Sequence, residues 1–314
     1  MATRGEEGLD ALIRVGGYAP AESSHGRALR HLADRVARLT SGEVEVDVLY
    51  NILDLGRPAV DLFDMVAAGE LTFCFFSSSY LGARVPELDV LEIPFLFEDL
   101  DHAHRALDGE LGAALTEATE RATPFTILGF WDNGFRHLTN RLHPVRLPED
   151  VRGMRVRLQP NRLHAAMVEA WGGIPVSVEL SVGIAAIAAG EVDAQENPLG
   201  NTVAYSVDEY HRHVTMSGHL YGARGLFANK EAIAALPDDV AAALATAVGE
   251  AIAFQRSVAE QGELDLRLRL EEKGLLFVDL TSDERAAFVA ATAPVRRMAE
   301  GEMEGRLLEL ADGA

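Results

Sequence analysis

Apolar residues along the first 131 positions alternate between helical and strand spacing. Helices are predicted near residues 24–41, 58–69 and 104–121, and strands near 44–48, 71–76 and 125–131. The first helix lies between a capping serine and a glycine, which are common at helix ends. The strand at 71–76 is apolar except for Thr72, as is typical of a strand buried on both faces. This alternation predicts an α/β fold.

A second block of the same kind begins near Gly134. Its predicted strands cover 154–158, 174–178 and 192–195, its predicted helices cover 162–170 and 182–189, and a last strand and helix follow from Val278. An Ala-rich, charged and proline-free segment runs from Asp238 to about Lys273. It predicts one helix that is unusually long for a compact domain, and we expect it to lie across two domains.

The charge balance narrows the classes of partner. The chain of 314 residues has 28 Lys and Arg against 49 Asp and Glu, a formal net charge of −21. Such a field repels phosphate backbones and anionic lipid headgroups, so we expect neither a nucleic-acid partner nor direct membrane insertion. An anionic ligand must therefore be held by a few locally placed arginines.

Cysteine content and the first residues bear on the cellular compartment. Cys74 is the single cysteine and lies in an apolar run, so we interpret it as a small buried hydrophobe and expect no intrachain disulfide. Residues 1–7 lack the basic-then-apolar layout of a secretion signal. Two interpretations stay open: the protein remains inside the cell, or an export segment has been removed.

Familiar catalytic and cofactor motifs are missing from the chain. It has no GxSxG, GxxxxGK[ST], HExxH or strand-linked GxGxxG pattern. His102 with His104, and His211 with His213, place two imidazoles close together, but neither pair has a third ligand at clear spacing. We therefore expect no catalytic residue, no metal and no cofactor, and favour hydrogen-bonded histidines.

Arginines gather on the strand predicted from Met154. Arg155 and Arg157 face the same way on that strand, and Arg152 lies just before it. We interpret Arg152 and Arg155 as solvated charges. Arg157 ends the strand beside Gln159, where an open α/β sheet delivers side chains to the crevice at its carboxyl edge. A guanidinium there offers a planar fork of donors matched to a carboxylate.

A polar cluster, residues 190–198, follows the next predicted strand. Pro198 holds Asn197 in an extended conformation, which sets the direction of its amide. One interpretation is a simple turn. The other is that Asn197 and Gln195 donate hydrogen bonds to a small polar ligand while Glu196 orients an arginine.

Three motifs in order carry a family resemblance. They are WDNGFRHLTN at 131–140, PEDVRGMRVR at 148–157 and VDAQENP at 192–198. Together they resemble the solute-binding proteins of tripartite ATP-independent periplasmic (TRAP) transporters, the DctP family. The likeness continues through PFLF at 94–97 and DHAH at 101–104, and downstream through 215–221, so it covers nearly the whole chain.

The resemblance implies a periplasmic-binding-protein-like fold of type II. Two α/β domains would close around an organic acid in the periplasm and deliver it to TRAP permease subunits driven by an ion gradient. We expect residues 1–133 with 223–262 to form the N-terminal domain, and 134–222 with 263–314 to form the C-terminal domain. The long helix would span both.

The resemblance also implies roles for residues at matching positions. Arg157 matches the arginine that pairs with the ligand carboxylate, Arg136 a second cationic position, and Asn197 the amide on the same ligand. The opposing wall is expected around His25 and the loop at 77–80, with Trp131 and Tyr221 against the ligand's carbon skeleton. The remaining predicted ligand contacts are Gln195, Ser79 and Tyr80. The predicted supporting residues are Glu196, Asn133 and Gln159.

One segment departs from the family pattern. Many relatives have Phe-Ser-Glu-Val-Tyr where this chain has LSVGI at 180–184, which removes an acid and an aromatic. A specific substrate such as a sialic acid therefore does not transfer. Two rival functions stay open: an enzyme acting on organic acids with His137 as its base, and a receptor that presents the ligand to a signalling partner. The enzyme is disfavoured because no nucleophile or cofactor loop accompanies the arginine. The identity of the acid, the oligomeric state and an accompanying cation are left open.

Overall fold

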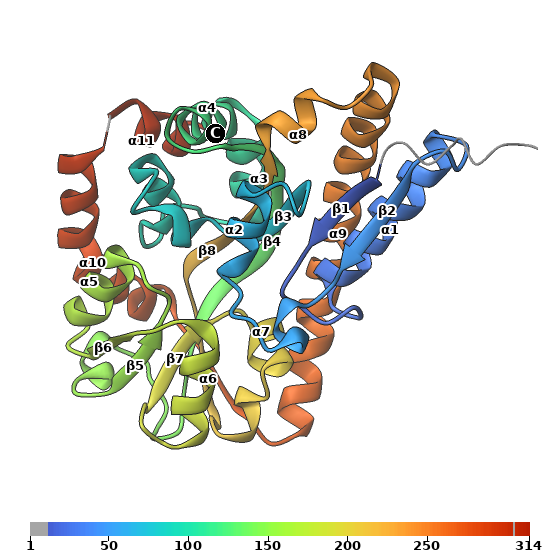
Figure 1. The fold of residues 1–314 in the computed structure, drawn as a ribbon. Coiled ribbons are helices and arrows are strands. Elements are labelled where there is room, and N and C mark those ends of the chain that lie inside the picture. Colours follow the sequence, from blue (N-terminus) through green and yellow to red (C-terminus); the bar gives the residue numbers. More distant parts are fainter. Residues whose placement is uncertain (1–11, 304) are drawn as a thin grey trace, which may run out of the picture. The chain divides into compact units, whose positions relative to one another are not determined.

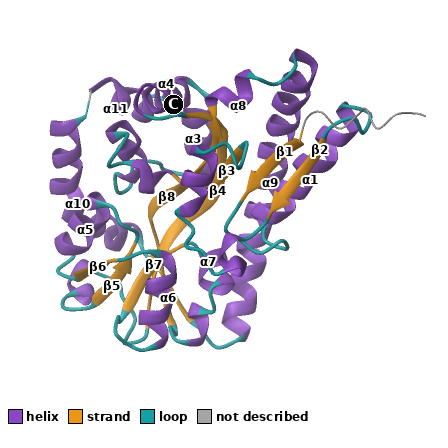
Figure 2. Cartoon of the chain, in the orientation of Figure 1, coloured by secondary structure: helices purple, strands orange, loops and turns teal. Residues whose placement is uncertain are grey.

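The computed structural model describes residues 12–303 and 305–314 of a mixed α/β chain (Figures 1 and 2). The prediction about a secretion signal in residues 1–7 lies outside this range. The chain folds as two compact units. Unit 1 contains residues 12–76, 124–131 and 225–257, and unit 2 contains 77–123, 132–224 and 258–314 apart from residue 304. Residues 77–123, placed in the first domain by the sequence-based division, thus cluster with unit 2.

Unit 1 is built on strands in the order β2-β1-β3-β8-β4. Strand β1 runs parallel to both β2 and β3. Its elements are β1 (Leu12–Gly16), α1 (Ser24–Leu39), β2 (Glu45–Leu49), the 3₁₀ turn Ile52–Leu55, α2 (Asp61–Ala67), β3 (Phe73–Ser77), β4 (Phe125–Asn140), β8 (His213–Asn229), α8 (Lys230–Ala234) and α9 (Asp238–Glu272). Parts of β4, β8 and α9, and the last residue of β3, belong to unit 2.

Helix α1 confirms the first predicted helix. The Ser23 side chain accepts a hydrogen bond from the Gly26 N–H at 3.0 Å and caps the helix, and Gly42 follows it with a φ of +82°. Its apolar face is buried. Within unit 1, α1 lies beside the first part of α9 (Figure 1), where Arg35 forms an ion pair with Glu250.

Strand β3 is buried at every position, as the apolar run that ends at Phe76 predicts, and the burial extends to Ser77. Cys74 lies within it as a free, fully buried thiol. Burial raises the pKa of the Cys74 thiol, because the thiolate would lose its hydration there. The interpretation of Cys74 as a small buried hydrophobe is therefore confirmed.

Unit 2 contains the strand order β9-β8-β4-β7-β5-β6. Its helices and strands, besides the parts shared with unit 1, are α3 (Leu100–Asp108), α4 (Glu110–Ala122), β5 (Arg155–Leu158), α5 (Arg162–Ala170), β6 (Ile174–Ser177), α6 (Leu180–Ala188), β7 (Ala194–Asn197), α7 (Leu199–Ala204), β9 (Leu276–Asp279), α10 (Ser282–Glu302) and α11 (Gly305–Asp312). Short 3₁₀ helices cover Ser78–Leu81, Pro86–Glu92, Pro148–Val151 and Val207–Glu209.

Strand pairing in unit 2 brings the three sequence motifs together. Strand β5 runs parallel to β6 and β7, so that Arg157 is level with Val176 on one side and Gln195 on the other. Strand β7 runs antiparallel to β4, which places Asn197 opposite His137. Figure 2 shows these short strands beside α6. The carboxyl ends of β5 and β7 therefore present their side chains at the same edge.

The predicted long helix is confirmed as α9, which is continuous from Asp238 to Glu272. Its residues 238–257 belong to unit 1 and 258–272 to unit 2. No proline interrupts it, and alanine, leucine and glutamate favour the helical state. Among the described residues, no helix combines the length and the apolar character needed to cross a membrane.

Two differences from the sequence-based prediction concern the region around Gly109 and strand β8. The single helix predicted near 104–121 is two helices, α3 and α4, because Gly109 between them has non-helical angles of φ −103° and ψ −148°. Strand β8 was not predicted, since its glycines and polar residues interrupt any simple alternation. It is held by pairing with neighbouring strands, which local periodicity does not reveal.

Candidate functional site

Arg157 is a buried guanidinium at the end of β5 in unit 2. The residue is 2% exposed, and its Nη2 donates a hydrogen bond to the Val178 carbonyl at 3.1 Å. Its Nε is buried without a hydrogen-bond acceptor among the described residues. No carboxylate in the described ranges forms an ion pair with it. A buried charge without a counter-charge is costly, so this position favours an anion supplied from outside the chain.

Gly183 on α6 gives Arg157 its space. A Cβ added at Gly183 would lie 2.4 Å from Arg157 Nε and 3.0 Å from its Cδ. Such distances are too short for any side chain, so the backbone of α6 packs directly against the arginine. The departure from the family pattern at 180–184 thus has a structural consequence, because a glycine at this position admits the guanidinium.

Arg136, the second predicted cationic position, is tied to Glu196. Both side chains are buried, and Arg136 Nη2 donates to Glu196 Oε1 at 2.8 Å and to the Glu196 carbonyl at 2.8 Å. Arg136 Nε also pairs with Glu196 Oε2. The guanidinium is therefore neutralised within unit 2 by Glu196.

Glu196 is the centre of a buried charge network. Burial alone would raise the pKa of Glu196, but the Arg136 charge and the adjacent His164 and His219 side chains hold it well below the usual range. His164 Nε2 lies 2.7 Å from Glu92 Oε2, and its Nδ1 lies 3.7 Å from Glu196 Oε1. Burial opposes protonation of His164, yet the two glutamates raise its pKa to about 9. Charges of alternating sign thus hold Arg136 in one place.

The amide of Asn197 belongs to a hydrogen-bonded row. Its Oδ1 accepts from Asn201 Nδ2 at 2.9 Å, and the same nitrogen lies 3.2 Å from Asn133 Oδ1. Arg224 Nη2 donates to that Asn133 oxygen at 2.7 Å. Because Oδ1 of Asn197 is an acceptor here, its amide nitrogen points the other way and makes no hydrogen bond to the described residues. That N–H group suits a carboxylate oxygen.

Two tyrosines share the electrostatic surroundings of Arg157. Burial raises the pKa of Tyr80, and the nearby charge of Arg157 opposes this effect. Burial likewise raises the pKa of Tyr205, opposed by Arg224 and Arg157. Tyr80 was predicted from the sequence, whereas Tyr205, Arg224 and Asn201 were not. The one sequence signal that could have indicated Asn201 is its position four residues after Asn197.

Other predicted contacts in unit 2 are engaged with neighbours. The Tyr221 hydroxyl donates to Asp132, and its ring packs against Phe97 at a centroid distance of 5.6 Å. Ser79 Oγ lies 2.9 Å from Ser77 Oγ. Gln195 Nε2 donates a hydrogen bond to Thr202 Oγ1 at 3.3 Å. The backbone carbonyl of Gln159 accepts one from Ser177 Oγ at 3.4 Å.

In unit 1 the predicted residues His25 and Trp131 meet around Phe75. The His25 ring stacks on Phe75 at 5.0 Å, and Trp131 lies 5.5 Å from the same ring. His25 lies in the first turn of α1, and Trp131 lies on β4. The rings of Phe75 and Trp131 and the imidazole of His25 thus form one aromatic cluster.

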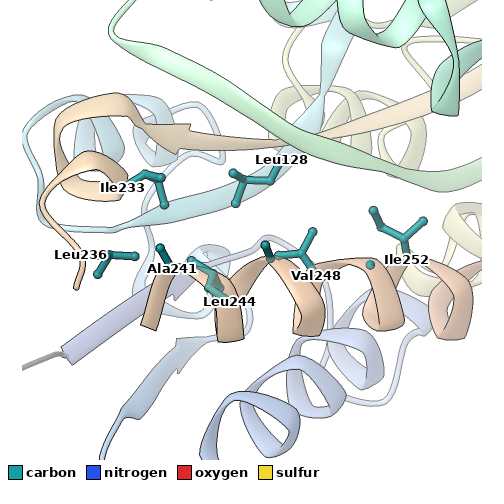
Figure 3. Close-up of a pocket in the computed structure, with 9 residues that line it drawn as sticks. Leu128, Ile233, Leu236, Ala241, Leu244, Val248 and Ile252 are labelled. Atoms are coloured by element: carbon teal, nitrogen blue, oxygen red, sulfur yellow. The ribbon is translucent and has the colours of Figure 1, made fainter. Parts of the chain in front are cut away.

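Two cavities in the structure do not suit an anion. In unit 1, a cavity of about 220 Å³ is lined by apolar side chains from β4, α9 and the α8 region, including Leu128 and Ile252 (Figure 3). In unit 2, a cavity of about 390 Å³ has the acids Glu98, Asp132, Glu260 and Glu263 in its lining together with one arginine, Arg285. The first offers no donor for a carboxylate, and in the second the acids outnumber the arginine, so the net charge disfavours an anion.

His137, the base in the rival enzyme interpretation, lines the acidic cavity. Its Nδ1 accepts a hydrogen bond from the Gly218 N–H at 3.1 Å, and its Nε2 lies 3.7 Å from Glu263 Oε1. The histidines weighed as metal ligands bind other groups: His102 contacts the Ala311 carbonyl, and His104 contacts Asp132. Within residues 12–303 and 305–314, no three His, Cys, Asp or Glu side chains are grouped as a metal ion requires.

A family model matches this chain over residues 15–302, and it describes "Bacterial extracellular solute-binding protein, family 7", DctP. A solute-binding protein of Verminephrobacter eiseniae is 32% identical, over 92% of this chain and 85% of the relative. The C4-dicarboxylate-binding periplasmic protein DctP of Rhodobacter capsulatus is 28% identical, over 92% of this chain and 86% of its own length.

Solved structures of TRAP periplasmic solute-binding proteins have the same fold. The protein from Roseobacter denitrificans, solved with bound β-D-glucuronate, is 26% identical with a TM-score of 0.90, covering 96% of this chain and 99% of that one. The protein from Sulfurospirillum deleyianum, solved with bound succinate, is 27% identical with a TM-score of 0.89, covering 96% and 98%. The predicted α/β, binding-protein-like fold is therefore confirmed.

Proposed function

Because this chain belongs to the bacterial extracellular solute-binding proteins of family 7, the DctP family, we propose that it captures a small organic acid for a TRAP permease. One observation carries the choice of an acid. Arg157 is a buried guanidinium with a single backbone hydrogen bond and no ion-pair partner among the described residues. A carboxylate matches its fork of donors and supplies the missing charge.

The proposed contacts centre on two side chains of unit 2. The ligand carboxylate pairs with the guanidinium of Arg157 and accepts a hydrogen bond from the amide nitrogen of Asn197. Arg136 acts as a positioning residue, because its charge is already taken up by Glu196. Ligand contacts by Gln195, Tyr80 and the other predicted residues stay predictions, as does closure of two lobes around the ligand.

The proposed cellular role follows from the family. The chain acts in the periplasm and hands the acid to the membrane subunits of a permease driven by an ion gradient. Its relatives from Verminephrobacter eiseniae, Roseobacter denitrificans and Sulfurospirillum deleyianum are solute-binding proteins, which supports transport rather than turnover. Recovery of the bound acid in unchanged form after prolonged incubation would agree with this role.

A thermal-shift screen against mono-, di- and hydroxycarboxylates and sugar acids tests the proposal. A ligand that binds only the native state at 100 times its Kd adds about 2.7 kcal/mol to the free energy of unfolding. For a chain of this size we expect the melting temperature to rise by roughly 5 °C. The methyl esters of the same acids serve as controls. No rise with any acid, or an equal rise with the esters, would contradict a carboxylate site.

Replacing Gly183 with alanine is expected to lower the affinity for the acid about tenfold. The added methyl group would occupy the space of Arg157 Nε and displace the guanidinium. Overpacking costs about 1–3 kcal/mol, partly offset by the better helix propensity of alanine, so the fold should persist. Calorimetric titration with the acid found in the screen measures the effect.

The matched control is Gly262→Ala. Gly262 also lies in a helix of unit 2, but no atom lies within 4 Å of its added Cβ. Its variant should keep the wild-type affinity. Equal affinities of the Gly183 and Gly262 variants would show that Arg157 does not depend on the space beside α6.

A further inference from the structure

Glu179 has one carboxylate oxygen in use and one without a partner. It precedes α6 as its N-cap residue, and its Oε2 accepts hydrogen bonds from the Ser181 N–H at 2.8 Å and from Ser181 Oγ at 2.6 Å. Its Oε1 is buried and has no hydrogen-bond partner among the described residues. Leaving a buried acceptor without a hydrogen bond costs about 1–3 kcal/mol, and more when the group is charged.

This choice of residue is unusual for a helix cap. Serine, threonine, aspartate and asparagine are the preferred N-cap residues, and any of them would satisfy the first turn of α6. Glutamate is longer, so Oε2 can cap the helix while Oε1 extends beyond it. Capping therefore explains one oxygen of Glu179 and leaves the other to be explained.

Glu179 and Arg157 lie in the same part of unit 2. The carbonyl that accepts from Arg157 Nη2 belongs to Val178, the residue before Glu179. The charges of both side chains act on the hydroxyls of Tyr80 and Tyr205. The two side chains nevertheless form no ion pair with each other. Arg157 has no ion-pair partner and Glu179 Oε1 has no donor among the described residues, and both groups lie in the same surroundings.

We infer that Glu179 Oε1 accepts a hydrogen bond from the ligand, so that the site selects hydroxy acids over the corresponding plain acids. The inference rests on the proposed function, because the ligand's carboxylate is held by Arg157. A hydroxyl close to that carboxylate reaches Oε1 while the carboxylate stays on the guanidinium. A hydroxyl suits the site better than an ammonium group, since Arg157 and Arg224 would repel a second cation.

The test compares hydroxy acids with their plain counterparts by calorimetric titration. The probes are malate against succinate and lactate against propionate, with the enantiomers of each hydroxy acid measured separately. For at least one pair, the wild-type protein should bind the hydroxy acid about tenfold more tightly, equivalent to about 1.4 kcal/mol. A plain acid that binds as tightly as its hydroxy counterpart in every pair would overturn the inference.

Glu179→Gln removes the proposed contact while keeping the size of the side chain. Its amide oxygen can still cap α6, and its amide nitrogen, a donor, then replaces the acceptor Oε1. The ratio of the affinities for the hydroxy acid and the plain acid should fall to about one. This ratio is the quantity compared, because removing the negative charge of Glu179 also acts on the affinity for the plain acid. A preference that survives this substitution would refute the role of Glu179.

Ser181→Ala separates ligand contact from capping. It removes the 2.6 Å hydrogen bond from Ser181 Oγ to Oε2 and leaves Oε1 in place. This variant should keep the preference for hydroxy acids, and losing it as fully as Glu179→Gln does would mean that Glu179 acts only as a cap. If succinate and propionate bind through Arg157 without any preference, the inference fails and the proposed function stands. If no acid binds at all, both fail.

Discussion

The Arg157→Ala protein is expected to bind its acid ligand at least tenfold more weakly than the wild type, a loss of roughly 1.4 kcal/mol or more. The substitution removes the buried guanidinium to which the ligand carboxylate is proposed to bind. The free protein should not lose stability in proportion, because a buried charge with one backbone hydrogen bond is itself costly. Calorimetric titration measures the affinity, and thermal melting without ligand measures the stability.

Arg155→Ala is the matched control for Arg157→Ala. Arg155 lies two positions earlier on the same strand and faces the same way, but it is half-exposed and paired with Asp193, with Nε 2.9 Å from Oδ2. Its removal should leave the affinity unchanged. Unchanged affinity in the Arg157 variant itself would contradict its role as the anchor, and equal losses in both variants would point to a general effect of positive charge.

Removing the Glu196 carboxylate is expected to destabilise the protein by about 3–5 kcal/mol. In Glu196→Ala the guanidinium of Arg136 stays buried without its bidentate partner, and His164 loses one of the two glutamates that favour its charged form. Burying an uncompensated charge is the dominant cost. Urea denaturation at neutral pH measures the change in the free energy of unfolding.

Glu117→Gln is the control for the Glu196 variant. Glu117 pairs with Arg121 on the exposed face of α4 at 3.0 Å, where solvent screens the charges. We expect a change of less than about 1 kcal/mol there. A similarly small change in Glu196→Ala would show that the buried network does not hold Arg136, and its proposed positioning role would then fail.

Local patterns predicted the elements whose burial follows from their own sequence. Helix α5 begins at Arg162 and ends at Ala170 as predicted, and α10 follows the last predicted strand with Thr281 as its N-cap. These elements form because apolar spacing and capping residues act within a few turns. Gly109 shows the limit, since the same apolar spacing continues through a break that only backbone geometry reveals.

The candidate site was predictable in outline and not in its connections. Arg157 and Asn197 could be singled out because strand alternation and a following proline set their directions. The partner of each charge could not be assigned. Arg136 and Arg157 look alike in the sequence, yet one is neutralised by Glu196 and the other has no acidic partner among the described residues. Glu179, Tyr205 and Arg224 gave no sequence signal.

By itself the sequence of this protein determined the α/β alternation, the long helix α9, the family and the arginine at the end of β5, because these depend on residues close together in the chain. Only the tertiary structure decided which arginine has no counter-charge among the described residues and which glycine makes room for it. Those outcomes depend on the pairing of β4 with β7 and on the packing of α6 against β5, contacts between distant segments. Charge and space at a site are properties of such contacts.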